Sequence, residues 1–527
     1  IPAGYLAWGS AVFDKLEGIF AIGLWDAQCR RLVLARDGIG VKPLFYSRSG
    51  PSLRFASEIK ALLADPGQPR TLDPIGLHRL FASGYVGPDA TTLQGIVQLE
   101  PGSVLTMDAA GETTIQRFWQ PSRHPTIHRM EEALETFLPL MARVVKDQLV
   151  SDIDIGILQS GGIDSTILSL TAGRVASVPL FTAAFANTAH DESALAAQVA
   201  KSAGLRHHMV NVSEDRDPSQ TFKRIVHHYD GQAADEAAGP LLLLTEALGR
   251  TTRVALSGDG GDEFFGGYPT YRATRIAARL EGLFPSGLAA MTGRWLYGHG
   301  NSEKARLPIA SVASRFLQGL ANGGAYAHTE WRRFLPQFLA RDLYGTALRE
   351  MATISPMAAY RRGFDTYPHA SVGERAMIAD QCVHLPGGLL YKTDCMSMAN
   401  SVEIRVPFLD RRIMEFAADC SEELLLPRSG PSKPLLRQAV RALGGPTDVS
   451  DGKKRGFNNP IAALLRGPLS SLADHLIVKN GGLMEPYLRP ERVAGLWADH
   501  LSGRRDHAYA LWPIVHFLQW RETTGAR

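Results

Sequence analysis

A glycine turn between a predicted strand and a predicted helix constrains this chain more than any other feature. Residues 154–158, apolar after Asp154, suit a short buried strand, and residues 166–171 suit the start of a helix. The turn between them belongs to the sequence Leu158-Gln-Ser-Gly-Gly-Ile-Asp-Ser-Thr166. Backbone N–H groups and the helix dipole favour an anion at such a turn. The segment therefore predicts a phosphate site at the end of a strand.

The segments that follow the turn continue an alternation of strand and helix. A helix is expected over 191–204, and strands are expected over 153–158, 178–185, 208–212 and 253–257. This alternation predicts a doubly wound parallel α/β sheet that binds ligands at the carboxyl ends of its strands. Beyond about residue 270 the chain is expected to be mostly helical.

The first part of the chain has a different pattern, typical of β structure. Strands are predicted over 18–25, 31–36 and 99–107, and a helix begins at Asp73-Pro74. We expect three aromatic side chains of this part in its core: Trp25, Phe45 and Tyr46.

A linker is expected over residues 117–129, which contain two prolines and no periodicity. Residues 130–150 form an amphipathic pattern, in which Pro139 predicts a kink or a break. Because 527 residues are too many for one core, we divide the chain into 1–116, the linker 117–129, and 130–527.

A second glycine-rich loop is predicted over residues 257–268, directly after a strand. Five glycines among these twelve residues let a ligand approach the backbone closely, and Asp259, Asp262 and Glu263 place carboxylates beside it. Carboxylates repel a phosphate unless a hard cation lies between them, so Mg²⁺ is implied. Asp164 and Asp262 are the natural pair to hold it, since both follow strands of the predicted sheet.

The first loop excludes several phosphate-binding and hydrolytic motifs. It lacks the lysine of a P-loop and the spacing of a dinucleotide fingerprint, and residues 156–160 do not form a nucleophile elbow. Its sequence resembles the PP-loop of ATP pyrophosphatases, in which amides and serine hydroxyls hold the departing pyrophosphate. A tight turn with a capping serine is the alternative, and the second loop makes it much weaker.

Composition narrows the class of protein further. The net charge of +3 gives no reason to expect nucleic acid as a partner, and no apolar run approaches the roughly 18 residues of a membrane span. The four cysteines form no CxxC pair, so we expect reduced, buried thiols rather than a metal knot: Cys29, Cys382, Cys395 and Cys420. We expect a cytoplasmic enzyme.

Together these motifs resemble the glutamine-hydrolysing asparagine synthetase family. The motifs that carry the resemblance occur in the family's order: 13–26, 35–46, 160–166, 257–268, 391–410 and 454–457. The resemblance implies a class II glutaminase domain of the N-terminal-nucleophile type, an α+β sandwich, followed by a PP-loop synthetase domain. It implies ATP and Mg²⁺, an acid such as aspartate, and ammonia or glutamine. A homodimer is possible in this family.

Site residues are implied by the same resemblance. The pyrophosphate loop would be Ser160, Gly161, Gly162, Asp164 and Ser165. Other contacts to the nucleotide would be Leu158, Phe185, Ser257 and Gly258. Asp164 and Asp262 would bind the metal. Asp259 would act as a base or orient the attacking nitrogen, and Lys454 would stabilise charge on the phosphate and the tetrahedral intermediate.

The start of the chain departs from the family's pattern. The family's glutaminase nucleophile is an N-terminal cysteine, whereas this chain begins with Ile1. We therefore expect an incomplete glutaminase domain, no glutamine hydrolysis, and a synthetase supplied with free ammonia.

Three alternative functions remain open from the sequence. The closest is a related amidotransferase or cyclase that acts on a sugar acid or on an antibiotic or peptide precursor. The second is modification of nucleic acid, which the small net charge disfavours. The third is a non-catalytic relic of a synthetase, against which the intact Asp164, Asp262 and Lys454 argue.

Overall fold

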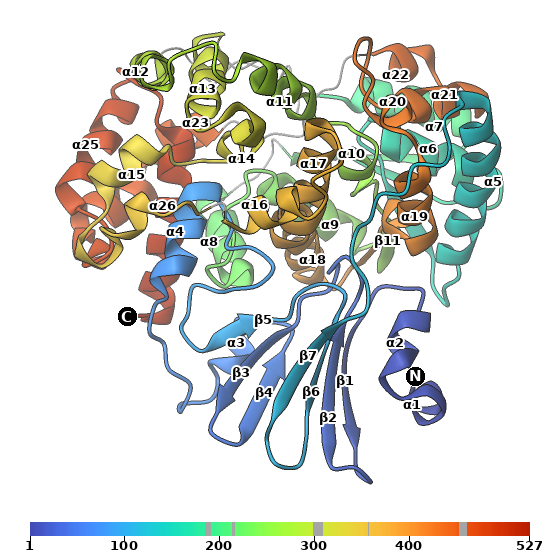
Figure 1. Ribbon diagram of the computed structural model, residues 1–527, viewed down its shortest axis with the longest axis horizontal. Coiled ribbons are helices and arrows are strands. Elements are labelled where there is room, and N and C mark those ends of the chain that lie inside the picture. The colour runs from blue at the N-terminus through green and yellow to red at the C-terminus, as the bar shows by residue number, and fades with distance from the viewer. Residues whose placement is uncertain (185–190, 213–216, 299–308, 357, 453–460) are drawn as a thin grey trace.

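The computed structural model describes all residues except 185–190, 213–216, 299–308, 357 and 453–460 (Figure 1). Two expected site residues, Phe185 and Lys454, lie outside the described residues. No helix in the described part of the chain combines the length and the apolar character that a membrane crossing requires.

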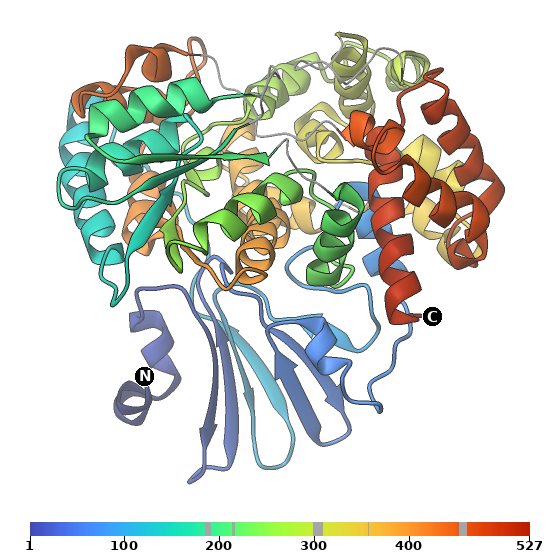
Figure 2. The same cartoon turned by 180° about the vertical axis from the view of Figure 1, so that it is seen from behind.

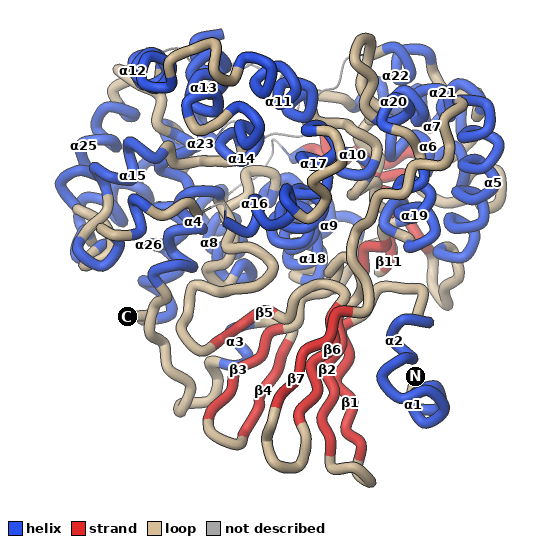
Figure 3. The backbone as a smooth tube through the Cα atoms, in the orientation of Figure 1, coloured by secondary structure: helices blue, strands red, loops and turns tan. Residues whose placement is uncertain are grey.

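Two antiparallel sheets form the N-terminal part of the molecule, below the helical body in Figure 3. The four-stranded sheet has the order β1 (Ala21–Asp26), β2 (Arg31–Arg36), β6 (Ser103–Met107), β7 (Thr113–Arg117). The three-stranded sheet has the order β4 (Ser52–Ala56), β3 (Phe45–Ser49), β5 (Ile96–Gln98). Short helices complete this part: α1 (Pro2–Trp8), α2 (Val12–Lys15) and α3 (Ile59–Leu62).

The predicted hairpin of β1 and β2 is confirmed, but the expected burial of its tryptophan is wrong. Ala21 pairs with Arg36 at one end and Asp26 with Arg31 at the other. Trp25 is 59% exposed, because β1 is an edge strand and Trp25 lies near the turn that projects away from the rest of the molecule. Phe45 is buried as expected, and Tyr46 is half-buried.

Helix α4 (Pro74–Ser83) joins the N-terminal part to the larger domain. Asp73 caps it as predicted, since its carboxylate accepts hydrogen bonds from the backbone N–H groups of Ile75 and Gly76. Its apolar face is buried against the C-terminal helix, where the Phe81 ring meets the edge of Phe517 at 5.2 Å between centroids. The N-terminal part therefore shares a core with the rest of the chain.

The predicted doubly wound parallel sheet is confirmed. Its strand order is β10 (His207–Asn211), β9 (Leu180–Ala184), β8 (Ile155–Leu158), β11 (Val254–Leu256), β12 (Glu403–Arg405). Two groups of helices flank it (Figures 1 and 2): α5 (Met130–Gln148), α6 (Ile163–Ala172) and α7 (Ser193–Ala203), then α8 (Pro218–Tyr229), α9 (Ala238–Leu248) and α18 (Leu390–Met398). The order reverses between β8 and β11, so the two glycine loops that follow these strands meet at the switch point.

The break considered at Pro139 does not occur, because α5 continues from Met130 to Gln148. Pro139 lies on the exposed face of the helix. The carbonyl that loses its intrahelical hydrogen bond to proline therefore faces water, where it can be satisfied.

The rest of the chain is helical, as predicted. Its α-helices are α10 (Gly261–Phe264), α11 (Pro269–Leu280), α12 (Ser286–Leu296), α13 (Ile309–Ala321), α14 (Ala327–Trp331), α15 (Gln337–Leu343), α16 (Ala358–Asp365), α17 (Val372–Ala379), α19 (Arg411–Asp419), α20 (Glu422–Leu425), α21 (Pro434–Ala442), α22 (Thr447–Asp451), α23 (Ile461–Arg466), α24 (Ser470–Asp474), α25 (Pro490–Leu501) and α26 (Ala508–Thr524). A π-helix, Asp380–Leu389, connects α17 to α18.

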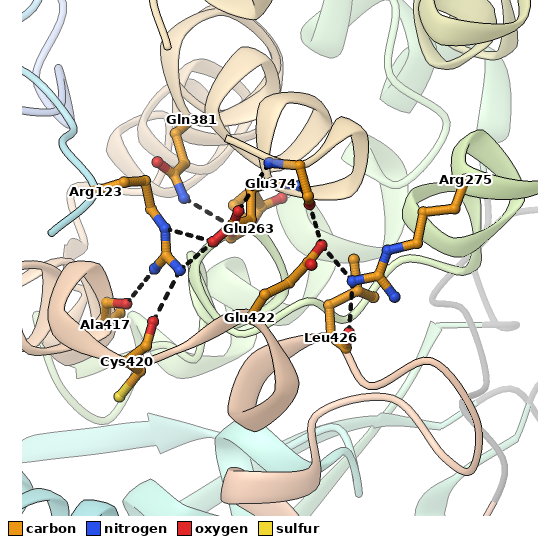
Figure 4. A network of polar contacts seen from close by, with 10 residues as sticks. Arg123, Glu263, Arg275, Glu374, Gln381, Ala417, Cys420, Glu422 and Leu426 are labelled. Carbon is orange, nitrogen blue, oxygen red and sulfur yellow. Dashed lines mark hydrogen bonds and ion pairs between the residues drawn. The ribbon is translucent and has the colours of Figure 1, made fainter. Parts of the chain in front are cut away.

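A buried arginine anchors the segment that we expected to be a linker (Figure 4). The Arg123 guanidinium pairs with Glu374, with its Nε 3.2 Å from the carboxylate, and donates to the carbonyls of Ala417 and Cys420 at 2.7 and 2.8 Å. Glu374 also completes the capping box that begins α17 with Ser371. The segment is thus fixed to α17 and to the C-terminal end of α19.

We expect Arg123→Ala to lower the melting temperature markedly. Breaking a buried ion pair by removing one partner costs about 3–5 kcal/mol, because the remaining charge stays buried. Arg129→Ala is the matched control, since the Arg129 side chain is 77% exposed on the same segment. Equal melting temperatures for the two variants in a calorimetric scan would contradict this account.

Candidate active site

The first glycine loop forms a compact turn between β8 and α6. Gly161 has φ +75°, a conformation that favours glycine, and Gly162 is the residue that caps α6. The hydroxyls of Ser160 and Ser165 lie 3.2 Å apart, and the N–H of Gly162 donates to Ser160 Oγ at 3.2 Å. Amides and hydroxyls therefore gather at the start of a ten-residue helix, where an anion is favoured.

The second glycine loop passes directly over the first. A Cβ on Gly258 would lie 2.9 Å from the Cβ of Asp164, and one on Gly261 would lie 2.5 Å from its carboxyl carbon. Any larger residue at these two positions would push the loops apart. The glycines thus explain how Asp164 and Asp262 come to face the same point.

That point is occupied by a lysine that the sequence analysis did not identify. Lys433 Nζ lies 2.7 and 2.5 Å from the two carboxylate oxygens of Asp164 and 2.6 Å from Asp262 Oδ1. Burial opposes the charge on this ammonium, but the two carboxylates outweigh burial and raise its pKa. The sequence does contain a signal that could have identified Lys433. It directly precedes the proline that starts α21, a position where the helix dipole disfavours a cation, so a lysine there is unexpected.

The position where Asp164 and Asp262 converge also fits a divalent cation. Two carboxylates that converge on one ammonium also suit a hard cation, and Mg²⁺ is commonly held by one or two carboxylates together with substrate phosphates. Among the described residues, no group of three or more His, Cys, Asp or Glu side chains could hold a metal by itself. The donor set therefore fits a cation that arrives with a phosphate ligand.

Asp259 is held at the same switch point by two hydroxyl groups. Ser257 Oγ and Thr393 Oγ1 donate to its carboxylate at 3.1 and 3.0 Å. The carboxylate is therefore oriented by its neighbours.

A cavity of about 580 Å³ brings these groups together. The predicted site residues that line it are Leu158, Ser160, Gly161, Gly162, Asp164, Ser165, Ser257, Gly258, Asp259 and Asp262. Residues 83–85 of the N-terminal part also line it, and the backbone N–H of Ala234 donates to the Gly84 carbonyl at 2.7 Å. The cavity wall is therefore built from both parts of the chain.

Four other polar residues of the 391–410 motif have contacts outside the phosphate loops: Asp394, Asn400, Arg405 and Asp410. Asp394 pairs with Lys42 of the N-terminal part at 2.7 Å. Asn400 donates to the Leu242 carbonyl, and its side-chain oxygen lies 3.4 Å from Arg224. Arg405 and Asp410 do not pair with each other. Their partners are Glu403 and two carbonyls for Arg405, and Arg412 for Asp410.

The adjacent histidines on β10, His207 and His208, both have contacts within the protein. His207 Nε2 lies 2.9 Å from Thr182 Oγ1, and the His208 ring stacks on Phe181. All four cysteines are free, and two of them are buried, but Cys29 is exposed, contrary to expectation.

Comparison with known proteins agrees with this architecture. Residues 136–522 match the asparagine synthase family, and residues 1–119 match a glutamine amidotransferase domain. Asparagine synthetase [glutamine-hydrolyzing] 1 of Bacillus subtilis is 28% identical over 98% of this chain and 79% of its own length.

Two further relatives show the range of proteins that are similar to this chain. A putative glutamine-hydrolysing asparagine synthetase of Mycobacterium tuberculosis is 30% identical over 99% of this chain and 78% of its own length. Amidase chyE of Penicillium rubens is 27% identical over 91% of this chain and 75% of its own length. With a family match over most of its length and the two glycine loops joined at one cavity, this chain belongs to the asparagine synthase family.

Proposed function

We propose that this protein is an ATP-dependent amide ligase that adenylates aspartate and then transfers ammonia to the acyl group. One observation carries the proposal: a single cavity joins a pyrophosphate-type loop, two converging carboxylates and an oriented third carboxylate. The named asparagine synthetases among the relatives support the choice of aspartate.

The first glycine loop would bind the departing pyrophosphate. Its amides and the hydroxyls of Ser160 and Ser165 would supply the donors that stabilise charge developing on the leaving group. Leu158 and Phe185 would contact adenosine, and Ser257 and Gly258 would line the nucleotide side.

Asp164 and Asp262 would hold Mg²⁺, which when bound neutralises negative charge on the phosphates. Lys433 would add a fixed positive charge at the same place. Asp259 would accept a proton from the attacking nitrogen or orient it, since a base must come within about 3 Å of its proton. Lys454 would stabilise the tetrahedral intermediate.

A related ligase that acts on another acid is the second candidate. The similarity to proteins named amidases, chyE and chry2, over 91% of this chain favours it. This candidate keeps the same adenylation and changes only the acid or the nucleophile.

We expect the purified protein to form AMP, pyrophosphate and asparagine from ATP, Mg²⁺, aspartate and ammonium.

Asp262→Asn should lower the rate of this reaction about 100- to 1,000-fold, because the site loses one charge that positions the phosphates. Asp152→Asn, at an exposed position, is the matched control. AMP release with other acids alone would favour the second candidate, and no AMP release with any acid would indicate a relic. Unchanged turnover in Asp262→Asn would contradict the role given to this carboxylate. A parallel reaction with glutamine in place of ammonium tests whether this chain hydrolyses glutamine.

Lys433→Met should make the stability of the protein depend more strongly on Mg²⁺. The substitution removes the cation that Asp164 and Asp262 share, so a divalent ion that binds only the folded state stabilises it by mass action. The measurement is the rise in melting temperature on adding MgCl₂, in the variant and in wild type. Lys479→Met, at an exposed position, serves as control. An equal rise in all three proteins would contradict a cation site at these carboxylates.

A further inference from the structure

The cavity extends past the phosphate loops into a region that we call the acid lobe, lined by Asp235, Glu236, Asp259, Arg315 and Lys392. The acid lobe adjoins the reaction end of the site, because Lys392 is next in sequence to Thr393, whose hydroxyl donates to Asp259. A substrate acid bound there would be next to the nucleotide.

Several charges around the acid lobe already have close partners. Asp259 accepts two hydroxyl hydrogen bonds, and Glu263 accepts one from Tyr268 at 2.6 Å. The Arg332 guanidinium binds the buried Asp380, with its Nε 3.0 Å from the carboxylate. Each of these groups therefore already has a close partner within the protein.

Lys392 and Glu236 differ from these groups. Lys392 is only 9% exposed, yet within the described part of the chain its ammonium makes no hydrogen bond. Its ion-pair partner, Asp235, is 3.9 Å away, near the limit for such a contact. Glu236 lines the cavity and is half-buried, and its carboxylate makes no hydrogen bond or ion pair with the side chain of any described residue. Arg315 lies over the Tyr509 ring at 5.0 Å.

The charges of Glu236 and Lys392 affect each other's pKa. A bound ligand of opposite charge would be favourable for each of them. Burial first, and then Asp235, raise the pKa of Glu236 to about 7. Burial opposes the charge of Lys392, but Asp235, Asp259 and Glu236 outweigh it and raise its pKa, so it remains an ammonium. A buried charge without a hydrogen-bonded partner is costly, and a ligand of opposite charge removes that cost.

We infer that Glu236 and Lys392 determine which acid the site accepts: Glu236 binds an ammonium group of the substrate, and Lys392 binds a second carboxylate that is not activated. The inference rests on the proposed function. The substrate class is then an amino acid that carries two carboxylates. A plain dicarboxylic acid leaves Glu236 without its ligand, and an amino acid with one carboxylate leaves Lys392 without its ligand.

Three acids separate the two contacts. Aspartate carries both recognised groups, succinate lacks the ammonium, and β-alanine lacks the second carboxylate. The measurement is ATP–pyrophosphate exchange with each acid, in wild type, Glu236→Gln and Lys392→Met. Exposed residues supply matched controls, Glu135→Gln and Lys479→Met.

In wild type, we expect kcat/KM for aspartate to exceed that for succinate and for β-alanine about 10- to 100-fold each, the usual range for a hydrogen bond to a charged group. Glu236→Gln should remove the preference over succinate and leave the rate with succinate unchanged. Lys392→Met should remove the preference over β-alanine and leave the rate with β-alanine unchanged. Lys392→Arg, which keeps the charge, should retain the preference over β-alanine.

The inference is overturned if wild type prefers succinate or β-alanine, or if a variant loses exchange equally with all three acids while its melting temperature stays at the wild-type value. Absence of exchange with every acid in wild type would remove the proposed ligase activity instead. In that case calorimetric binding decides: tighter binding of aspartate than of the other two acids, lost in both variants, supports the inference, and equal binding overturns it.

Discussion

The contact between one buried ammonium and two carboxylates joins the separate parts of the candidate active site. Lys433 precedes α21, whereas Asp164 and Asp262 belong to the loops after β8 and β11. The carboxylates of Asp164 and Asp262, which both contact the Lys433 ammonium, repel each other, and the fixed cation between them offsets that repulsion. The geometry of both glycine loops therefore depends on a third segment more than 150 residues further along the chain.

Much of the fold and most of the site could be predicted because the decisive signals are local. Strand, glycine turn and helix follow one another within twelve residues on each side of Asp164, and parallel strands bring such turns to one edge. Lys433 was missed because its role depends on contacts between distant segments. Trp25 was misjudged because alternation along a strand does not reveal whether another layer covers that face.

The charges of the cavity fall into two zones with different physical characters. Around Lys433 every described contact is short and strongly paired, which suits groups that must hold one geometry while phosphates bind and leave. In the acid lobe Lys392 is buried and Glu236 is half-buried, and neither has a close side-chain partner among the described residues, which suits recognition of a ligand from solution. Asp259 and Thr393 lie where the two zones meet.

The wall formed by residues 83–85 has a consequence for how this protein is divided into modules. One family match ends at residue 119 and the other begins at residue 136, yet Gly84 and Tyr85, on the N-terminal side of that boundary, line the cavity of the C-terminal domain. A C-terminal domain expressed without residues 1–119 would keep both glycine loops but lose part of the cavity wall. The family matches divide this chain into two domains, but both domains build the cavity of the candidate active site.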